Sequence, residues 1–346
     1  MAESKQIIQE LVDPPPDTLP DSVEDFLRQL GGPTLLRVTG VDRSRTRAIV
    51  TLLHGNEPSG VRAVHQWLRQ GNQPAVNIVC CIASVAAALR SPLFTHRMLP
   101  GDRDLNRCFR PPFDDEQGRI AEQILRLLHA SQPELLVDIH NTSGSGPAFG
   151  VVTQENARHE ALVWHFSSRM VVTDLKLGSL MEASPSAAPY VTIECGGAND
   201  KDSDLVAQHG LHRLLYAQDC LSLPADNISM DVYHQSVRLE LLPGSKIAIA
   251  EAAVASADIT VHPEFERLNF GTVDISTPLA WLGERGADQL RVKDSSGKDV
   301  FDEYFRVKDS TLFAAQRLKL FMITTKPEIV VGDCLLYASP EAVHTR

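Results

Sequence analysis

The feature that most constrains the fold of this chain is the alternation of strand-like and helix-like segments over its first two thirds. Runs of β-branched and aliphatic residues, bounded by turn residues, predict strands. Segments with apolar residues at helical spacing lie between these runs and predict helices. Such alternation favours an α/β fold, in which helices cover the faces of a sheet. The strands are expected at residues 34–40, 47–54, 76–84, 133–140 and 190–197, and the helices at residues 22–32, 60–71, 116–130 and 204–221.

From Tyr233 onward the pattern changes to short strand-like segments with turn residues between them. We therefore expect a smaller, mainly β domain at the C-terminal end, and a chain of 346 residues is long enough for two domains. The predicted division is 1–45 for a lead-in helix and first strand, 46–225 for the main α/β domain, and 226–346 for the β-rich domain. The β-rich segments are residues 237–242, 246–254, 257–262, 278–283 and 328–338.

The composition of the chain argues against two classes of partner, nucleic acids and membranes. A formal net charge of −11 argues against nucleic acid, because phosphate recognition needs a basic face. The opening residues have no apolar core flanked by basic residues, and no stretch reaches the apolar length of a membrane span. The six cysteines form no CxxC pair and suit a reducing compartment. We expect a cytoplasmic protein without nucleic-acid or membrane partners. The sequence is compatible with a monomer and with a homo-oligomer.

A first candidate site follows the predicted strand 47–54, where the sequence runs from His54 through Gly55 and Asn56 to Glu57. The turn from a strand into a helix is a common place for a site on an open α/β sheet. Imidazole nitrogen and carboxylate oxygen are frequent ligands of catalytic zinc. HxxE is nevertheless a common pattern, and alone it favours a capping glutamate and a surface histidine.

His140 ends a second strand of this kind, the apolar run of residues 133–140. Two histidines and one glutamate would leave an open position for water, which distinguishes a catalytic zinc site from a closed structural one. Asp138 lies two residues earlier on the same face of the strand and could orient His140. The alternative is that His140 caps its strand and bonds to backbone.

Charged side chains elsewhere could serve such a metal. Five arginines lie between Arg90 and Arg110, and Arg97 and Arg107 stand out among them. An arginine can grip a carboxylate through two parallel bonds, or stabilise the oxyanion that forms when water attacks a carbonyl. Taken singly, each is more simply explained as part of a solvated basic loop. Glu194 lies near the end of an apolar strand, where an ionised carboxylate needs a partner, and it would suit the general base of hydrolysis.

Four motifs, taken in order, resemble the succinylglutamate desuccinylase/aspartoacylase family, which is related to zinc carboxypeptidases. The likeness runs from about residue 47 to the C-terminus, because residues 257–271 and the β-rich tail also look like the second domain of that family. It implies a zinc-carboxypeptidase-like α/β fold, in which helices flank a mixed sheet and a smaller, mainly β domain follows. The motifs are HGNE at 54–57, DLNR at 104–107, DIHNT at 138–142 and the strand glutamate Glu194.

The resemblance also implies an activity. It predicts a zinc-dependent amidohydrolase or deacylase that acts on carbon–nitrogen bonds other than peptide bonds, with one zinc ion per chain. The expected partner is a small, carboxylate-bearing N-acyl amino acid, and residues 46–225 would form the catalytic domain. The implied roles are zinc ligation by His54, Glu57 and His140, catalysis by Glu194 as base and Arg97 as the group that polarises the scissile carbonyl, and carboxylate binding by Asn106 and Arg107.

One departure from the family pattern bears on the substrate. Members that cleave N-acylated acidic amino acids have a further arginine shortly before the catalytic glutamate, whereas residues 181–193 contain none. A second acidic group on the substrate is therefore in doubt. Tyr190 and Tyr304 could supply hydroxyls instead, but both are more simply explained as packing residues. The alternatives are a zinc carboxypeptidase or peptide amidase with the same metal centre, and a non-catalytic relative that binds a carboxylate.

Overall fold

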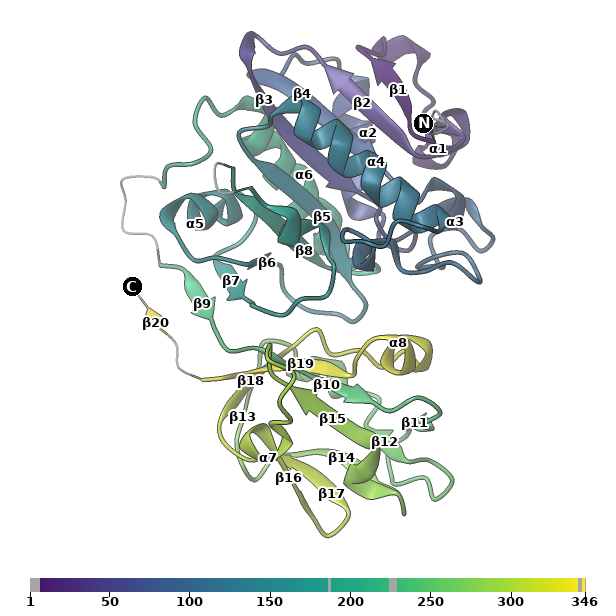
Figure 1. The fold of residues 1–346 in the computed structure, drawn as a ribbon, viewed down its shortest axis with the longest axis vertical. Coiled ribbons are helices and arrows are strands. Elements are labelled where there is room, and N and C mark those ends of the chain that lie inside the picture. The colour runs from purple at the N-terminus through teal and green to yellow at the C-terminus, as the bar shows by residue number, and fades with distance from the viewer. Residues whose placement is uncertain (1–6, 186–187, 224–228, 342–343, 346) are drawn as a thin grey trace. The chain divides into compact units, whose positions relative to one another are not determined.

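The computed structural model describes residues 7–185, 188–223, 229–341 and 344–345, and the chain forms two compact units (Figure 1). Unit 1 comprises Met1–Asn141, Ala148–Arg169 and Lys176–Met230. Unit 2 comprises Thr142–Pro147, Met170–Leu175 and Asp231–Arg346. The predicted domain boundary between residues 225 and 226 lies outside the described residues.

The main sheet of unit 1 is mixed, as predicted. Within the unit its strands follow the order β1-β2-β4-β3-β5-β8-β6. Strand β3 pairs in parallel with β4 and β5, whereas β2 is antiparallel to β4 and β6 is antiparallel to β8. The strands are β1 (Gln9–Val12), β2 (Thr34–Val38), β3 (Asp42–Thr51), β4 (Val76–Ile82), β5 (Leu136–Thr142), β6 (Phe149–Val152) and β8 (Tyr190–Gly197).

Helices cover both faces of this sheet. Helix α4 (Glu116–Ser131) lies on the face turned toward the viewer in Figure 1, and α2 (Ser59–Gln70) and α6 (Lys201–Tyr216) lie behind. Helix α2 approaches β3 so closely that a Cβ atom on Gly60 would lie 2.2 Å from Thr51 Oγ1. Glycine is therefore required there. The remaining helical segments of unit 1 are η1 (Pro16–Thr18), α1 (Val23–Leu30), α3 (Val85–Leu89), η2 (Leu105–Arg107), α5 (Ala157–Trp164) and η3 (Leu180–Ala183).

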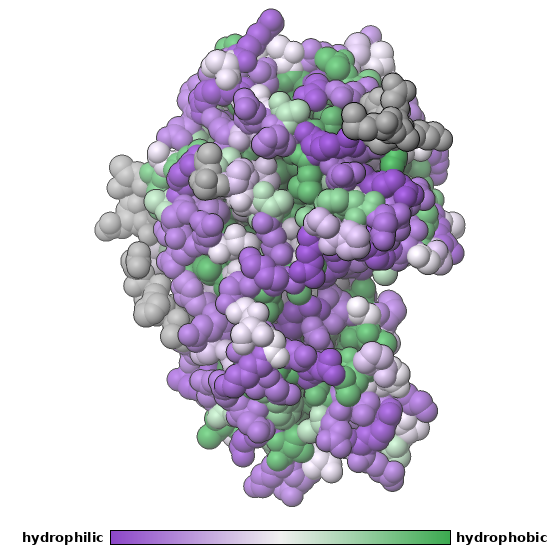
Figure 2. All heavy atoms as spheres, in the orientation of Figure 1, coloured by the Kyte–Doolittle hydropathy of each residue, from purple (hydrophilic) through white to green (hydrophobic). Residues whose placement is uncertain are grey.

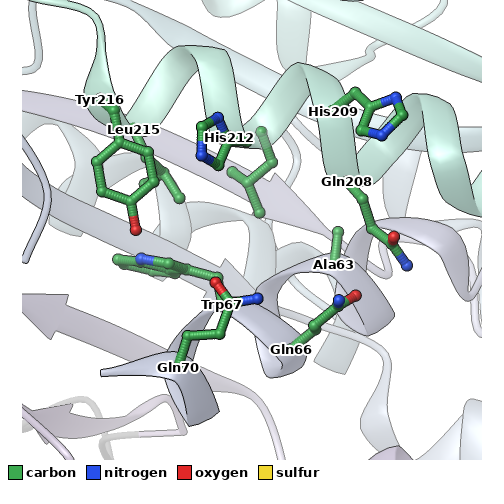
Figure 3. A pocket seen from close by; sticks show the side chains of 10 residues that line it. Ala63, Gln66, Trp67, Gln70, Gln208, His209, His212, Leu215 and Tyr216 are labelled. Carbon is green, nitrogen blue, oxygen red and sulfur yellow. The ribbon is translucent and has the colours of Figure 1, made fainter. Parts of the chain in front are cut away.

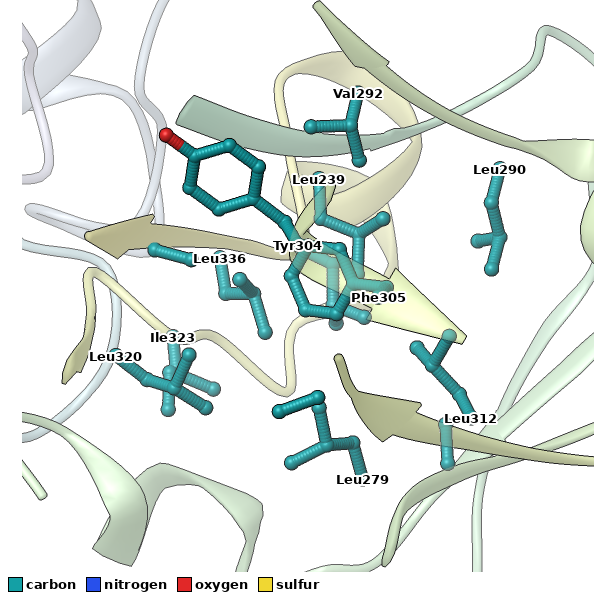
Figure 4. Packing of buried hydrophobic residues seen from close by; sticks show 14 of the residues in the cluster. Leu239, Leu279, Leu290, Val292, Tyr304, Phe305, Leu312, Leu320, Ile323 and Leu336 are labelled. Atoms are coloured by element: carbon teal, nitrogen blue, oxygen red, sulfur yellow. The ribbon is translucent and has the colours of Figure 1, made fainter. Parts of the chain in front are cut away.

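Unit 2 is mainly β, as predicted. It contains one five-stranded sheet in the order β13-β18-β19-β10-β15 and another in the order β11-β12-β14-β17-β16. Aliphatic and aromatic side chains of these strands form its buried core, part of which Figure 4 shows around Phe305. The strands and helical segments are β7 (Arg169–Val172), β9 (Asp231–Tyr233), β10 (Val237–Leu241), β11 (Ile247–Ile249), β12 (Ile259–Val261), η4 (Phe265–Leu268), β13 (Thr272–Val273), β14 (Pro278–Leu282), η5 (Gly286–Gln289), β15 (Leu290–Lys293), α7 (Phe301–Tyr304), β16 (Phe305–Lys308), β17 (Thr311–Ala314), β18 (Leu318–Phe321), α8 (Pro327–Gly332), β19 (Leu336–Pro340) and β20 (His344–Thr345).

Several local predictions need correction. Strand β3 ends at Thr51 and not at His54, because Leu52 turns the backbone into the left-handed region with φ of 58°. The predicted strand 328–338 begins as helix α8, since Pro327 occupies the first helical turn, where a missing N–H costs nothing. Helix α1 agrees with its prediction, because the Ser22 side chain accepts a hydrogen bond from the backbone N–H of Asp25.

The surface is mixed in character. Hydrophilic residues cover most of the face shown in Figure 2, and hydrophobic residues form smaller groups between them. Within the described residues, no helix has both the length and the apolar character needed to cross a membrane.

Arg47 is a fully buried cation at the start of the apolar part of β3. Its Nε donates to Glu134 Oε1 at 2.7 Å, and its Nη1 donates to the carbonyl oxygens of Leu214 at 2.6 Å and Ala217 at 2.8 Å. A third carbonyl, that of Gln218, accepts from Nη2 at 3.1 Å. One guanidinium thus satisfies the C-terminal end of α6, where carbonyl groups lack helical partners, and fixes it to the central strand.

Replacing Arg47 with Met should therefore lower the free energy of unfolding of unit 1 by about 3–5 kcal/mol, because Glu134 and the carbonyls lose a buried partner. Arg45→Met is the matched control, since Arg45 pairs with the same Glu134 but is one third exposed. That change should cost at most about 1 kcal/mol. Urea titration followed through the fluorescence of Trp67 and Trp164, which both lie in unit 1, measures the difference in a Trp281→Phe background, because Trp281 lies in unit 2. Equal losses in the two variants would contradict this role of Arg47.

Candidate metal centre

One loop and one strand of unit 1 bring together the histidines and glutamate singled out in the sequence. His54 and Glu57 lie in the connection between β3 and α2, and His140 lies within β5. All three side chains are buried. Their ligand atoms lie within 4.8 Å of one another, and among the described residues this is the one such group found of three or more histidine, cysteine or acidic side chains.

Glu57 stands between the two imidazoles. Its Oε1 is 2.8 Å from His54 Nδ1, and its Oε2 is 2.6 Å from His140 Nδ1. Burial alone would raise the pKa of Glu57, but the two neighbouring imidazoles hold it well below its ordinary value. The glutamate is therefore ionised at neutral pH, with both Nδ1 atoms turned toward it.

The opposite nitrogen of each imidazole meets a further carboxylate. Asp138 Oδ2 is 2.8 Å from His140 Nε2, and Asp104 Oδ1 is 2.9 Å from His54 Nε2. Burial would raise the pKa of Asp104, but His54 and Arg97 lower it far below its usual range. The position of Asp138 is the one suggested by the sequence. The sequence does not predict the role of Asp104, because its contact with His54 joins residues 50 positions apart along the chain.

These contacts suit a divalent metal ion. With each Nε2 hydrogen-bonded to a carboxylate, each Nδ1 can present a lone pair toward Glu57, and a cation would take the place of the protons shared there. Two imidazole nitrogens and one carboxylate oxygen form a donor set of catalytic zinc sites, which keep a further position open. The three residues therefore fit zinc.

Arg97 is held beside this cluster. Its Nε and Nη2 donate to Asp104 Oδ2 at 3.0 and 2.8 Å, and its Nη1 lies 3.6 Å from Glu57 Oε1. The Arg97 carbonyl also accepts from the N–H of Gly55 at 2.9 Å, within the His54–Glu57 loop. Asp104 therefore contacts both a candidate ligand and the arginine predicted to polarise the substrate.

Asn106 and Arg107 lie in the short helix η2, which Asp104 caps by accepting from the N–H of Asn106 at 2.8 Å. The Asn106 side chain is buried, and its Oδ1 accepts from the N–H of Leu180 at 3.0 Å. Its Nδ2 lies 3.5 Å from His140 Nε2. Arg107 is half-buried and donates to the Asn106 carbonyl at 3.0 Å. Asn106 therefore borders the candidate ligands, and Arg107 follows at the adjacent position.

Glu194 lies in β8, opposite Phe149 of β6. Its side chain is buried, and Oε2 has no hydrogen-bond partner. Burial raises the pKa of Glu194 to about 7, and the charges of His140, Glu57, His54 and Arg97 also act on it. A buried carboxylate oxygen without a hydrogen-bond partner, close enough to these groups to feel their charge, is a typical feature of a functional site.

The two tyrosines considered in the sequence, and a pair of histidines on α6, belong to other parts of the structure. Tyr190 packs in the core between α4 and the sheet, and Tyr304 donates to the carbonyl of Gln235 within unit 2 at 2.9 Å. His209 and His212 lie on α6 and line a groove between α2 and α6 (Figure 3). None of the described residues that line this groove adds a cysteine, an acidic residue or a third histidine. The pair therefore lacks the further ligands of a metal site.

Comparison with known proteins identifies the family of this domain. Residues 44–214 match the model of the succinylglutamate desuccinylase/aspartoacylase catalytic domain. None of the curated proteins matches the sequence significantly. The matched range covers every residue of the candidate centre. These residues are His54, Glu57, Arg97, Asp104, Asn106, Arg107, Asp138, His140 and Glu194.

Solved structures of low sequence identity share the fold. The product-bound ectoine utilization protein EutE (DoeB) from Ruegeria pomeroyi is 17% identical, with a TM-score of 0.58 over 88% of this chain and 88% of that one. A succinylglutamate desuccinylase/aspartoacylase from Rhodobacter sphaeroides is 14% identical, with a TM-score of 0.58 over 88% and 87%. Murine aminoacylase 3 is 19% identical, with a TM-score of 0.55 over 88% and 97%. The likeness extends over most of each chain and therefore includes both units.

The cluster predicts one tightly bound zinc ion per chain. His140→Ala should lower zinc affinity by more than the roughly 100-fold that loss of an outer hydrogen-bond partner causes, because it removes a ligand. The control is the double variant His209→Ala/His212→Ala, which removes the histidine pair of the α2–α6 groove and should bind zinc like the wild type. Competition with a chromophoric chelator measures both. Loss of zinc in the double variant, with retention in His140→Ala, would place the metal elsewhere.

Proposed function

We propose that this chain, which belongs to the succinylglutamate desuccinylase/aspartoacylase family, is a zinc-dependent hydrolase of the amide bond of a small N-acyl amino acid. The observation that carries the proposal is the buried group of His54, Glu57 and His140, with the unpaired carboxylate oxygen of Glu194 under its electrostatic influence. The three residues would hold the zinc ion. When bound, zinc supplies a Lewis acid that acidifies water and polarises a carbonyl group.

Glu194 would act as the general base. Burial raises the pKa of Glu194 to about 7 in the metal-free protein. Such a carboxylate can accept a proton from the attacking water and release it afterwards. The proton would then pass from Glu194 to the departing nitrogen, so the amine leaves uncharged. Burial of the carboxylate keeps this proton away from bulk solvent between the two transfers.

The arginines would divide the recognition of substrate. Arg97, held by Asp104 next to Glu57, would stabilise the negative charge that develops on the carbonyl oxygen. Arg107, with the amide of Asn106, would hold the carboxylate of the substrate through charge-assisted hydrogen bonds. The carboxylate would then fix the acyl group over the water, which is the orientation that hydrolysis requires.

The proposal extends to the chain as a whole. Residues 46–225 would form the catalytic domain and residues 226–346 the smaller β-rich domain. We place the protein in the cytoplasm, in keeping with six free cysteines that are all buried. Two proteins of similar fold, murine aminoacylase 3 and the succinylglutamate desuccinylase/aspartoacylase from Rhodobacter sphaeroides, support by their names an N-acyl amino acid as substrate. The alternatives are a carboxypeptidase or peptide amidase, and a non-catalytic carboxylate-binding relative.

A substrate panel separates these functions. The zinc-loaded protein should hydrolyse N-acetyl or N-succinyl amino acids, and short peptides with free C-termini should be poorer substrates. Glu194→Gln should lower kcat by about 10²–10⁴-fold, because it removes the base, while zinc content stays at the wild-type level. Turnover of peptides alone would show that the protein is a peptidase and contradict the proposal. Zinc binding without turnover of any panel member would favour a non-catalytic relative that binds a carboxylate.

Kinetics of arginine variants test how the two guanidinium groups are used. Arg107→Met should raise KM for a carboxylate-bearing substrate by about 10–100-fold, and should matter little for the same substrate with a carboxamide. Arg97→Met should mainly lower kcat, by about 10²–10³-fold, because its contact would strengthen as the oxyanion forms.

Arg110→Met serves as the control for both arginine variants, since Arg110 is exposed in the same loop. It should leave kcat and KM near the wild-type values. If Arg107→Met weakened the carboxylate and carboxamide substrates equally, Arg107 would not be the carboxylate contact.

A further inference from the structure

We propose that Asn141 is a positioning residue. It holds three segments in one fixed arrangement: the loop of His54 and Glu57, strand β5 with His140, and strand β8 with Glu194. The inference rests on the proposed function, because it concerns the geometry of that centre. Asn141 follows His140 directly in β5, and its side chain is almost completely buried at 2% exposure. Its side chain and backbone contact all three segments.

The side-chain amide of Asn141 uses both its acceptor and its donor group. Oδ1 accepts from the N–H of Ser59 at 3.0 Å, and Nδ2 donates to Ser59 Oγ at 2.9 Å. The same Nδ2 donates to the carbonyl of Gly196 at 3.1 Å. Ser59 is two residues after Glu57, and Gly196 is two residues after Glu194. The Asn141 side chain therefore links the segment of the candidate ligand Glu57 to the strand of the candidate base Glu194.

The backbone of Asn141 adds a direct contact with the centre, because its N–H lies 3.3 Å from Glu57 Oε2. Helix α2 begins at Ser59 after Pro58, which offers no side-chain cap. The N–H of Ser59 would be a buried donor without a partner, and Asn141 Oδ1 supplies that partner from another strand. The start of α2, and with it the position of Glu57, thus depends on this amide.

The connection continues away from the metal centre. Ser59 Oγ donates to Asp204 Oδ1 of α6 at 2.6 Å, and Asp204 also pairs with Arg62 of α2 at 3.1 Å. The chain of hydrogen bonds therefore runs from β5 through the start of α2 to the first turn of α6. An aspartate at position 141 would keep the shape of the side chain but could not donate to Gly196 or Ser59 Oγ.

The decisive variant is Asn141→Asp. It should lower zinc affinity by about 10–100-fold, the range seen when a residue that supports metal ligands is lost. At saturating zinc it should also lower kcat with little change in KM, because the strand of Glu194 loses its link to the ligand loop. Ser59→Ala keeps the N–H contact and removes only the hydroxyl, so it should show a smaller loss of zinc affinity. This second variant tests the same proposal if Asn141→Asp does not fold.

The matched control is Asn156→Ala. Asn156 caps α5 in the same unit by accepting from the N–H groups of Arg158 and His159. It should lower the Tm of the metal-free protein and leave zinc affinity within about two-fold. Wild-type zinc affinity in both Asn141→Asp and Ser59→Ala would overturn the role of Asn141 and leave the proposed function standing. Absence of zinc binding by the wild type would overturn both.

Discussion

The structure of the candidate centre depends on one electrostatic constraint, the burial of the Glu57 carboxylate between two imidazoles. A buried charge is costly unless it is paired and hydrogen-bonded. Here the negative charge is met by His54 and His140, and those rings are in turn oriented by Asp104 and Asp138. Each imidazole therefore has one nitrogen fixed by an outer carboxylate and one directed inward. In that arrangement three side chains from two segments can share a metal ion.

The surrounding fold keeps these groups close. Strand β3 delivers the loop of His54 and Glu57, β5 carries His140, and their parallel pairing sets both on the same region of the sheet. Asp104 connects the centre to Arg97, so the group proposed to stabilise the oxyanion is positioned by the same carboxylate that orients a ligand. The family match, the fold and the charge pattern thus all support the proposed hydrolysis, and the proposed roles of Arg97 and Arg107 bear on its substrate.

Much of this arrangement could be predicted from the sequence because it depends on local pattern. The alternation of strands and helices predicted an α/β sheet with helices on its faces, and the family resemblance implied that this sheet is mixed. The two-residue period of a strand placed Asp138 beside His140. The sequence did not predict the helix that starts at Pro327 or the early end of β3. Each depends on the backbone conformation of a single residue, Pro327 in the first case and Leu52 in the second. The contacts of Asp104 with His54 and of Asn141 with Ser59 could not be found, since they join residues 50 and 82 positions apart along the chain.

The central claim is that zinc binds between His54, Glu57 and His140, and anomalous diffraction at the zinc absorption edge tests it most directly. Crystals of the zinc-loaded protein should show one strong peak about 2.0–2.2 Å from Nδ1 of each histidine and from the Glu57 carboxylate. An anomalous map without a peak at this cluster, or with its peak at His209 and His212, would contradict the account.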